Sequence, residues 1–415
     1  MKPAVEHSSD VASPSLWQNR DYLLLWGGQV VSLTGTEITQ TAFPLLVWDF
    51  THSAVQVGLV GGLGTLPYLF LSLPAGALID RWNRKRTMIL CDIGRGLNLG
   101  SVLLALVLGH LLIAQLYLNA LVEGSLFVFF NLAEVACLPH VVAAKQLPAA
   151  TAQNEATQGI TMLLSPLLGG ALYSLRQALP FLADALSYGV SVLSLLLIRT
   201  EFQQERQRAA RPQLLSEIKE GLLWLWQNPL ICYMAFLTGG LNFTSAGLIP
   251  ILLVLVKQAY GSSILYGVIL TMGGIGGIVG ALIASPVQKR FRFGSIIISV
   301  LWIGALIWPL YAVTSLPILL GAVSAVIFLT GPIYNVVSIS YRLALIPDVL
   351  QGRVNSVFRL LAFGFQPLGW ILTGVLIQTL GVVSTVLILS VCQIVLAVAT
   401  TFNPHVRGAR PLSEI

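Results

Sequence analysis

The stretch from residue 76 to residue 86 reads Gly76-Ala-Leu-Ile-Asp80-Arg81-Trp-Asn-Arg84-Lys85-Arg86 and closes a long apolar run. Its first four residues recur at 280–283, again at the end of an apolar run and again before a basic cluster. A repeat at this spacing indicates one half of about 200 residues written twice. Further segments recur at nearly the same spacing: 43–46 with 249–252, and 138–142 with 346–350.

Composition indicates a membrane protein. Of 415 residues, 56% are hydrophobic and 10% are charged, whereas a soluble domain has about 25% charged residues. The alternation typical of membrane β-strands is missing from the sequence. We therefore predict an all-α membrane protein, because a bilayer-crossing helix needs about 20 apolar residues. Twelve runs qualify as transmembrane helices: 21–48, 54–79, 87–109, 114–138, 152–175, 179–198, 229–256, 265–286, 295–314, 317–341, 354–379 and 382–402.

The distribution of positive charge predicts the orientation in the membrane. Of 23 lysines and arginines, only Arg176 and Lys257 fall in breaks after odd-numbered spans, and the basic clusters fall in the other breaks. Cytoplasmic loops carry such an excess of Lys and Arg. We predict a multi-pass protein of the cell (plasma) membrane with both termini cytoplasmic. The charge thus reports topology in a lipid bilayer and indicates no nucleic-acid partner.

A polar stretch at 200–213 divides the spans into six and six, and the segment 214–227 has apolar residues at helical spacing. Such a helix is typical of a membrane surface. The predicted segments are a cytoplasmic N-terminal tail at 1–20, an N-terminal six-helix bundle at 21–198, a cytoplasmic linker with the amphipathic helix at 199–228, a C-terminal six-helix bundle at 229–402, and a cytoplasmic C-terminal tail at 403–415.

The sequence offers no motif for an enzyme. A G-x-x-x-x-G-K-[ST] phosphate loop, a nucleophile elbow and a Rossmann fingerprint are all missing. The four cysteines lie within or at the ends of apolar runs without paired spacing, so we expect free thiols and no metal site. We therefore predict a protein that is not an enzyme and has no cofactor.

The stretch 76–86 resembles the motif G-x-L-x-D-R-x-x-R-K/R between helices 2 and 3 of the major facilitator superfamily. The segments 165–170 and 352–354 resemble its bacterial drug and siderophore efflux branch, which includes the enterobactin exporter and macrolide efflux proteins. The resemblance spans residues 16–402 and implies two pseudo-symmetric six-helix bundles that rock around a central cavity. One departure is Ser165, where the family's helix 5 antiporter motif usually has glycine.

The resemblance also implies a latch between the halves on the cytoplasmic side. The family's latch aspartate corresponds to Asp80, whose carboxylate would suit the positive N-terminal end of a helix in the other half. Asp92 and Arg95, one turn apart, are expected to extend this network. The alternative is that these charges only set topology. The predicted latch residues are Gly76, Asp80, Arg81, Arg84, Lys85, Asp92, Arg95 and Arg353.

Acids in the middle of apolar spans are candidates for proton coupling. Glu37 lies in the polar segment 34–41 of the first span, and Glu123 lies in the fourth. Many drug/proton antiporters of the superfamily carry an arginine in helix 4, which this chain lacks. An ionised acid at mid-bilayer costs about 2.5–3.5 kcal/mol, so it should face water, find a partner or stay protonated. The alternative role is interhelical hydrogen bonding. The predicted proton and substrate cavity comprises Glu37, Glu123, Thr34, Thr41, Asn242, Tyr334, Asn335 and Gln366.

Small residues predict where helices approach closely. Glycines spaced four apart in the eighth span let two backbones touch. Static packing and contacts that rearrange both fit this pattern. The predicted helix-packing residues are Pro166, Gly169, Gly170, Gly273, Gly277 and Gly280.

These features together predict a secondary active transporter that exports a small amphipathic compound by alternating access. Protons are the expected coupling ion, since the sequence has no site for a nucleotide fuel, and a monomer is the expected state. Two alternatives stay open: an uptake carrier of the same fold, and a transporter-like receptor or scaffold that binds without transport.

Overall fold

The computed structural model describes residues 16–79, 81–202, 214–347 and 350–409, and all regular secondary structure in these ranges is helical. The first half forms α1 (Arg20–Thr51), α2 (Ala54–Ile79), α3 (Arg84–Leu108), α4 (Ile113–Val141), α5 (Leu147–Leu175) and α6 (Leu179–Leu197). The second half forms α8 (Pro229–Ala246), α9 (Leu248–Tyr260), α10 (Ser263–Arg290), α11 (Phe293–Ile307), α12 (Leu310–Val313), α13 (Pro317–Leu345), α14 (Gln351–Gly364), α15 (Gln366–Leu380) and α16 (Val382–Phe402). Outside these lie α7 (Leu214–Gln227), α17 (Pro404–Arg407) and two short turns, η1 (Leu16–Gln18) and η2 (Ala144–Gln146).

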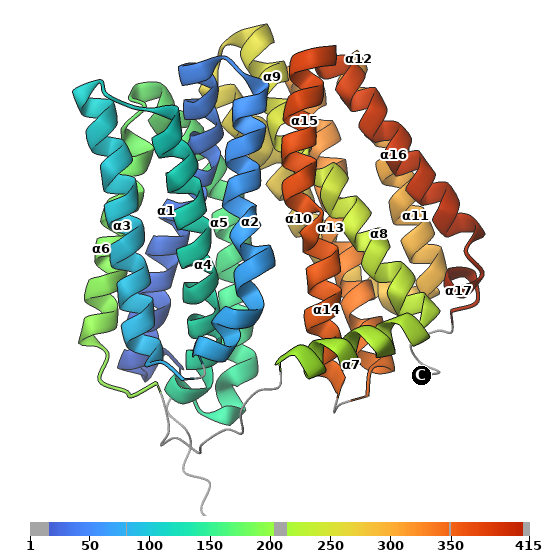
Figure 1. Cartoon of the computed structure of the whole chain (residues 1–415), viewed down its shortest axis with the longest axis horizontal. Helices are drawn as coiled ribbons and strands as arrows, with labels where there is room; N and C mark the ends of the chain where they lie inside the picture. The colour runs from blue at the N-terminus through green and yellow to red at the C-terminus, as the bar shows by residue number, and fades with distance from the viewer. Residues whose placement is uncertain (1–15, 80, 203–213, 348–349, 410–415) are drawn as a thin grey trace, which may run out of the picture.

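The helices gather into two bundles that stand side by side (Figure 1). Helices α1 to α6 form one bundle and α8 to α16 form the other, while α7 lies across one end of the second bundle. We call the end that carries α7 and the basic clusters the basic end, and the other the opposite end. The predicted fold class, an all-α membrane protein of two six-helix bundles, is confirmed.

Ten helices or helix pairs are long and apolar enough to cross a membrane within the described residues. The two crossings that fall short in hydropathy are α1 and α5, which have 32 and 29 residues. At 1.5 Å per residue each exceeds the roughly 30 Å of a hydrocarbon core. Their low hydropathy comes from polar segments such as 34–41, so these helices require polar or wet neighbours.

Three crossings of the second half are broken, where the sequence predicted continuous spans at 229–256, 295–314 and 354–379. The breaks separate α8 from α9 at Gly247, α11 from α12 at Trp308, and α14 from α15 at Phe365. A proline follows each break within three residues. Proline lacks the N–H that would continue the helical ladder, so a break near it costs little.

The halves share a core toward the opposite end only. One cluster of buried apolar side chains contains residues of both halves, including Leu45 and Leu252. The other two clusters belong to one half each, with Met88 in the first half and Ile297 in the second. The two bundles therefore pack together toward the opposite end and keep separate cores toward the basic end.

Polar contacts between the halves follow the same pattern. The Asp49 carboxylate of the first half lies 2.9 Å from Nζ of Lys257 of the second half. Within the first half, the Tyr173 hydroxyl donates to the same carboxylate at 3.1 Å. The amide of Ala54 donates to Oε1 of Gln378 at 3.0 Å. The contacts of Asp49 with Lys257 and of Ala54 with Gln378 join the two halves, and both lie at the opposite end.

Candidate functional site

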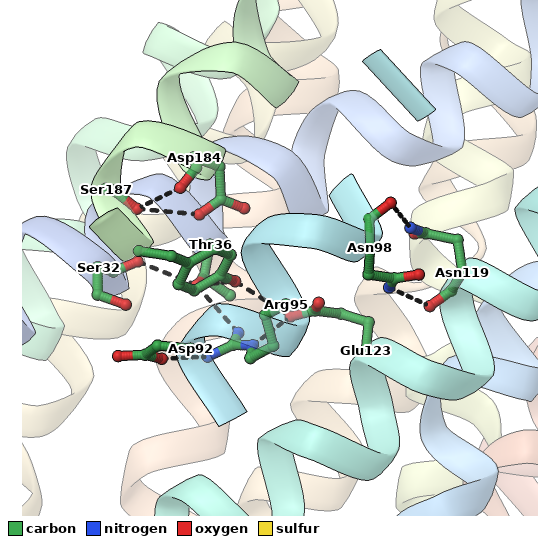
Figure 2. A network of polar contacts seen from close by, with 10 residues as sticks. Ser32, Thr36, Asp92, Arg95, Asn98, Asn119, Glu123, Asp184 and Ser187 are labelled. Atoms are coloured by element: carbon green, nitrogen blue, oxygen red, sulfur yellow. Dashed lines mark hydrogen bonds and ion pairs between the residues drawn. The ribbon is translucent and has the colours of Figure 1, made fainter. Parts of the chain in front are cut away.

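The interior of the first bundle is organised around Arg95, near the middle of α3. Only 3% of its side chain is exposed, and its Nε donates to Oε1 of Glu123 on α4 at 2.6 Å. Its Nη2 donates to Oγ1 of Thr36 on α1 at 3.2 Å (Figure 2). The Tyr188 ring of α6 lies 4.4 Å from the guanidinium, and its hydroxyl donates to Glu123 at 3.1 Å. Four helices thus meet at one buried ion pair.

One further carboxylate, Asp92, lies beside the same guanidinium, and a second, Asp184, interacts with it electrostatically. Oδ1 of Asp92 lies 3.9 Å from Nη1 of Arg95, and Asp92 is fully buried. Asp184, 1% exposed, accepts a hydrogen bond from Ser187 at 3.1 Å (Figure 2). The Ser191 hydroxyl lies near Asp92 and the Thr39 hydroxyl near Asp184, but neither contact meets hydrogen-bond geometry. This charged cluster (Arg95 with Asp92, Glu123 and Asp184) holds one cation for three acids.

A pair of asparagines fixes α3 against α4 beside the ion pair. Nδ2 of Asn98 donates to the backbone oxygen of Asn119 at 3.0 Å, and Nδ2 of Asn119 donates to that of Asn98 at 3.1 Å (Figure 2). Asn98 lies one turn after Arg95, and Asn119 one turn before Glu123. Because both bonds use backbone oxygens, they set the sliding position of the two helices and so the position of the ion pair.

The structure separates Glu37 from this cluster. Although it follows Thr36, its half-buried side chain makes no hydrogen bond or ion pair with a described residue. Thr34 donates to the backbone oxygen of Val30, and Thr41 donates to that of Glu37. These predicted cavity residues therefore satisfy their hydroxyls within α1, and of the two predicted acids only Glu123 joins the network.

The second bundle contains a cavity of about 160 Å³ between α8, α11, α13 and α16. Three of the predicted residues, Asn242, Tyr334 and Asn335, line it. Nδ2 of Asn242 donates to the backbone oxygen of Ala362 at 2.8 Å, and the Tyr334 hydroxyl lies 2.7 Å from that of Thr238. Gln366 is not part of the lining, because it lies at the start of α15, outside these four helices.

Several residues at these two sites were not predicted from the sequence. Tyr188 in the cluster and Trp308 and Gln393 in the cavity resemble ordinary packing residues in an apolar run. Arg95 was assigned to the latch, although a lone arginine near the middle of an apolar span is itself a signal. Such a residue almost always faces the bundle interior and pairs with an acid.

Those predicted latch residues that the structure describes do not form one group. Asp92 and Arg95 belong to the charged cluster, because their place near mid-helix keeps them from the cytoplasmic surface. Arg353 pairs with Glu220 of α7, within its own half. Asp80 lies outside the described residues, Arg81 lies in the turn after α2, and Gly76 has open space around it.

Arg84 and Lys85 bind backbone oxygens of their own bundle, and the one that Lys85 binds lies at a helix end. Nη1 of Arg84 donates to the backbone oxygen of Ala136 at 2.9 Å, and Nζ of Lys85 donates to that of Ile198 at 2.6 Å. Ile198 is the C-terminal cap of α6. The last carbonyls of a helix lack partners and carry partial negative charge, so cations there are favourable.

Close helix approach occurs at most of the predicted packing residues. A β-carbon at Gly170 would lie 2.5 Å from the backbone oxygen of Ser263, so α5 and α10 touch across the two halves. Within the second half, a β-carbon at Gly280 would lie 2.2 Å from the backbone oxygen of Leu329. Gly277 has no neighbour closer than 3.9 Å and takes little part. The others lie in contacts of the same kind: Pro166 opposite Gly267, Gly169 against Ile38, and Gly273 against Phe328.

Some known proteins are similar to this chain in sequence, and solved structures share its fold. The Major Facilitator Superfamily model matches residues 25–365. The multidrug efflux pump Tap of Mycolicibacterium fortuitum is 29% identical over 403 residues, covering 93% of this chain and 96% of its own. Macrolide efflux protein A of Streptococcus pyogenes is 28% identical over 214 residues, 51% of this chain and 52% of its own. The crystal structure of the nucleoside transporter NupG superposes with a TM-score of 0.75 at 14% identity, covering 92% of this chain and 98% of that one. This multi-pass membrane protein therefore belongs to the Major Facilitator Superfamily.

Proposed function

We propose that this transporter exports a small amphipathic compound and is driven by protons moving inward. The proposal rests on the charged cluster, in which one buried cation is accompanied by three buried or partly buried acids. Unpaired ionised acids are expensive in a low-dielectric interior, so this cluster is suited to taking up and releasing a proton. Export is supported by the similarity to proteins named efflux pumps. The positive-inside rule favours a cytoplasmic basic end.

Glu123 is the acid best placed to carry the proton. Its side chain is 23% exposed, whereas Arg95 and Asp92 are almost completely buried, so Glu123 forms the edge of the cluster. Its Oε1 receives bonds from Arg95 and Tyr188, while its Oε2 has no partner and offers a place for the proton. A proton on Glu123 removes the charge that holds Arg95 to α4.

Release of Arg95 from Glu123 would couple protonation to a conformational change of the transporter. The guanidinium then has Asp92 of its own helix and Thr36 of α1 as its remaining neighbours, so its attachment shifts from α4 toward α1 and α3. A ligand moves a conformational equilibrium only through a difference in interactions between two states, and this change of partner is such a difference. The Asp49–Lys257 pair at the opposite end would part when that end opens.

The test is a transport assay in everted membrane vesicles with a panel of uncharged, cationic and anionic amphiphiles, with and without a protonophore. Export predicts proton-dependent accumulation inside the vesicles. Glu123→Gln should lower this accumulation about a hundredfold or more, because a positioned proton-transfer group typically contributes about 10²–10⁴-fold. Substrate exchange without net proton movement should continue. Glu155→Gln, a change of an exposed acid on α5, is the matched control and should transport normally.

The alternatives give different results in the same assay. Accumulation in right-side-out vesicles would indicate an uptake carrier, and binding without transport in either orientation would indicate a receptor or scaffold. Full proton-dependent accumulation by Glu123→Gln would remove the charged cluster from the coupling mechanism.

A further inference from the structure

The cavity of the second half corresponds in position to the charged cluster of the first half. Thr36 and Asn242 each lie eight residues before a recurring proline, and Glu123 and Gly331 each lie sixteen residues before another. The helices correspond too, since the cluster uses the first, third, fourth and sixth crossings of its half, as the cavity does. The recurring prolines are Pro44 with Pro250, and Pro139 with Pro347.

At this equivalent position the second half carries no charge. Its cavity is lined by neutral side chains alone, and glycines occur at Gly304 and Gly331. A β-carbon at Gly331 would meet nothing within 4 Å, so the missing side chain there leaves open space. The Glu123 side chain fills this position in the first half, whereas the equivalent position in the second half, at Gly331, is open.

The cavity wall has hydrogen-bonding groups without partners. Trp308 is fully buried, and its indole N–H has no acceptor. Oε1 of Gln393, a residue 6% exposed, receives no hydrogen bond from a described residue. Asn242 uses its amide nitrogen on Ala362, which leaves Oδ1 as an acceptor. Since an unpaired buried polar group is costly, the Trp308 N–H, with two free acceptor oxygens on the same wall, points to a ligand that pairs with them.

Size and access limit the ligand further. The volume of about 160 Å³ is close to that of an engineered cavity of about 150 Å³ that binds benzene. Ser245, Gly331 and Asn335 belong to the lining and are also exposed, so the cavity communicates with the surface. Leu301 and Ile327 supply apolar wall.

We propose that this cavity binds an uncharged hydrogen-bonding group about the size of one six-membered ring, at one end of an amphipathic ligand. A carboxamide fits the wall, because its oxygen can accept from Trp308 and its nitrogen can donate to Gln393 or Asn242. A charged group would be buried without a counter-ion, which is unfavourable. The proposal deepens the proposed function, since it names the class of compound that the transporter would carry.

The test uses three ligands that share one ring and one tail: 4-butylcyclohexanecarboxamide, 4-butylcyclohexylammonium and 4-butylcyclohexanecarboxylate. Binding to the full-length protein in nanodiscs is measured by isothermal titration calorimetry, with protein-free nanodiscs subtracted. The carboxamide should bind at least about tenfold more tightly than either charged ligand. Equal or tighter binding of the ammonium or the carboxylate would overturn the proposal.

Substitutions locate the binding in the cavity. Gly331→Leu fills open space and should abolish carboxamide binding, while Gly100→Leu is the matched control, since a β-carbon at Gly100 of α3 also meets nothing within 4 Å. Gln393→Leu and Trp308→Phe should each weaken the carboxamide about tenfold, because each leaves one ligand group unpaired. Wild-type affinity in a folded Gly331→Leu protein would contradict the proposal.

This experiment separates the inference from the proposed function. Glu155→Gln should bind the carboxamide normally, because it changes an exposed acid on α5 that belongs to neither the cavity nor the charged cluster. Carboxamide binding without proton-driven transport would leave the cavity assignment standing and reject the coupling. Proton-driven transport of other compounds without carboxamide binding would reject the cavity assignment alone.

Discussion

The two halves of this protein share a fold and differ in what fills their interiors. In the first half, the space between four helices holds Arg95, Glu123 and Tyr188 in direct contact. In the second half, the corresponding space is a cavity with neutral walls. The two halves have the same helices in the same order. Single residues decide whether the space between these helices is filled by charged side chains or stays open as a cavity. This difference underlies our proposals that the first half handles protons and the second half binds substrate.

The clearest test of this difference is Arg95→Gln. Removing one partner of a buried ion pair typically costs about 3–5 kcal/mol, because the other charge stays buried without compensation. We expect a loss of this size in the free energy of unfolding, measured by denaturant titration in detergent, together with loss of transport. Three acids would then share no cation.

Arg342→Gln is the matched control in the second half. The Arg342 guanidinium lies 3.9 Å from the Phe358 ring centre and forms no ion pair with a described acid. Losing such a contact costs about 0.5–2 kcal/mol. A larger effect for Arg342 than for Arg95 would contradict the assignment of the charge-bearing interior to the first half.

A double-mutant cycle tests whether Arg95 and Glu123 act as a pair, and its expected coupling energy is the next largest effect. Arg95→Gln and Glu123→Gln should interact by about 1–3 kcal/mol, since the two side chains are in contact. The double variant should unfold less easily than the sum of the single changes implies, measured by the same titration. Additivity within about 0.5 kcal/mol would show that the two charges do not depend on each other.

Much of the fold could be predicted because hydropathy and the repeat are local properties. The number of crossings follows from the lengths of the apolar runs. Whether each crossing is one continuous helix or a broken one does not. Pro44 lies inside the unbroken α1, whereas Pro367 follows a break. Neighbouring helices decide whether the backbone groups freed by a proline find partners, and these neighbours are not visible in a single span.

The candidate site was less predictable, because it depends on how helices rotate about their axes. Glu123 was predicted as an intramembrane acid of the proton and substrate cavity, yet its partner Arg95 was assigned to the cytoplasmic latch. The two lie 28 residues apart on different helices. Only the packing of α3 on α4, fixed by Asn98 and Asn119, brings them together. The cavity likewise arises from residues of four separate crossings.

A smaller effect is expected where the halves meet. Asp49→Asn weakens the ion pair with Lys257, in which the Asp49 side chain is 25% exposed and the Lys257 side chain 8%. We expect the closed state of the opposite end to lose about 1 kcal/mol of stability. Opening there should expose Ala54, which is buried between the halves. A cysteine at Ala54 should then react about fivefold faster with a membrane-impermeant maleimide. Unchanged labelling would show that the pair does not hold this end closed.

The smallest effect is expected at the basic end, where Arg353→Gln and Glu220→Gln break one exposed ion pair. Exposed pairs contribute about 0–1 kcal/mol, so both variants should unfold and transport much like the wild type. The two changes should also have equal effects if each residue acts only through the other. A much larger loss of transport for Arg353→Gln than for Glu220→Gln would reveal a second partner for Arg353 in another conformation. That result would restore Arg353 to the latch inferred from the sequence, and it would place one determinant of coupling outside the first half.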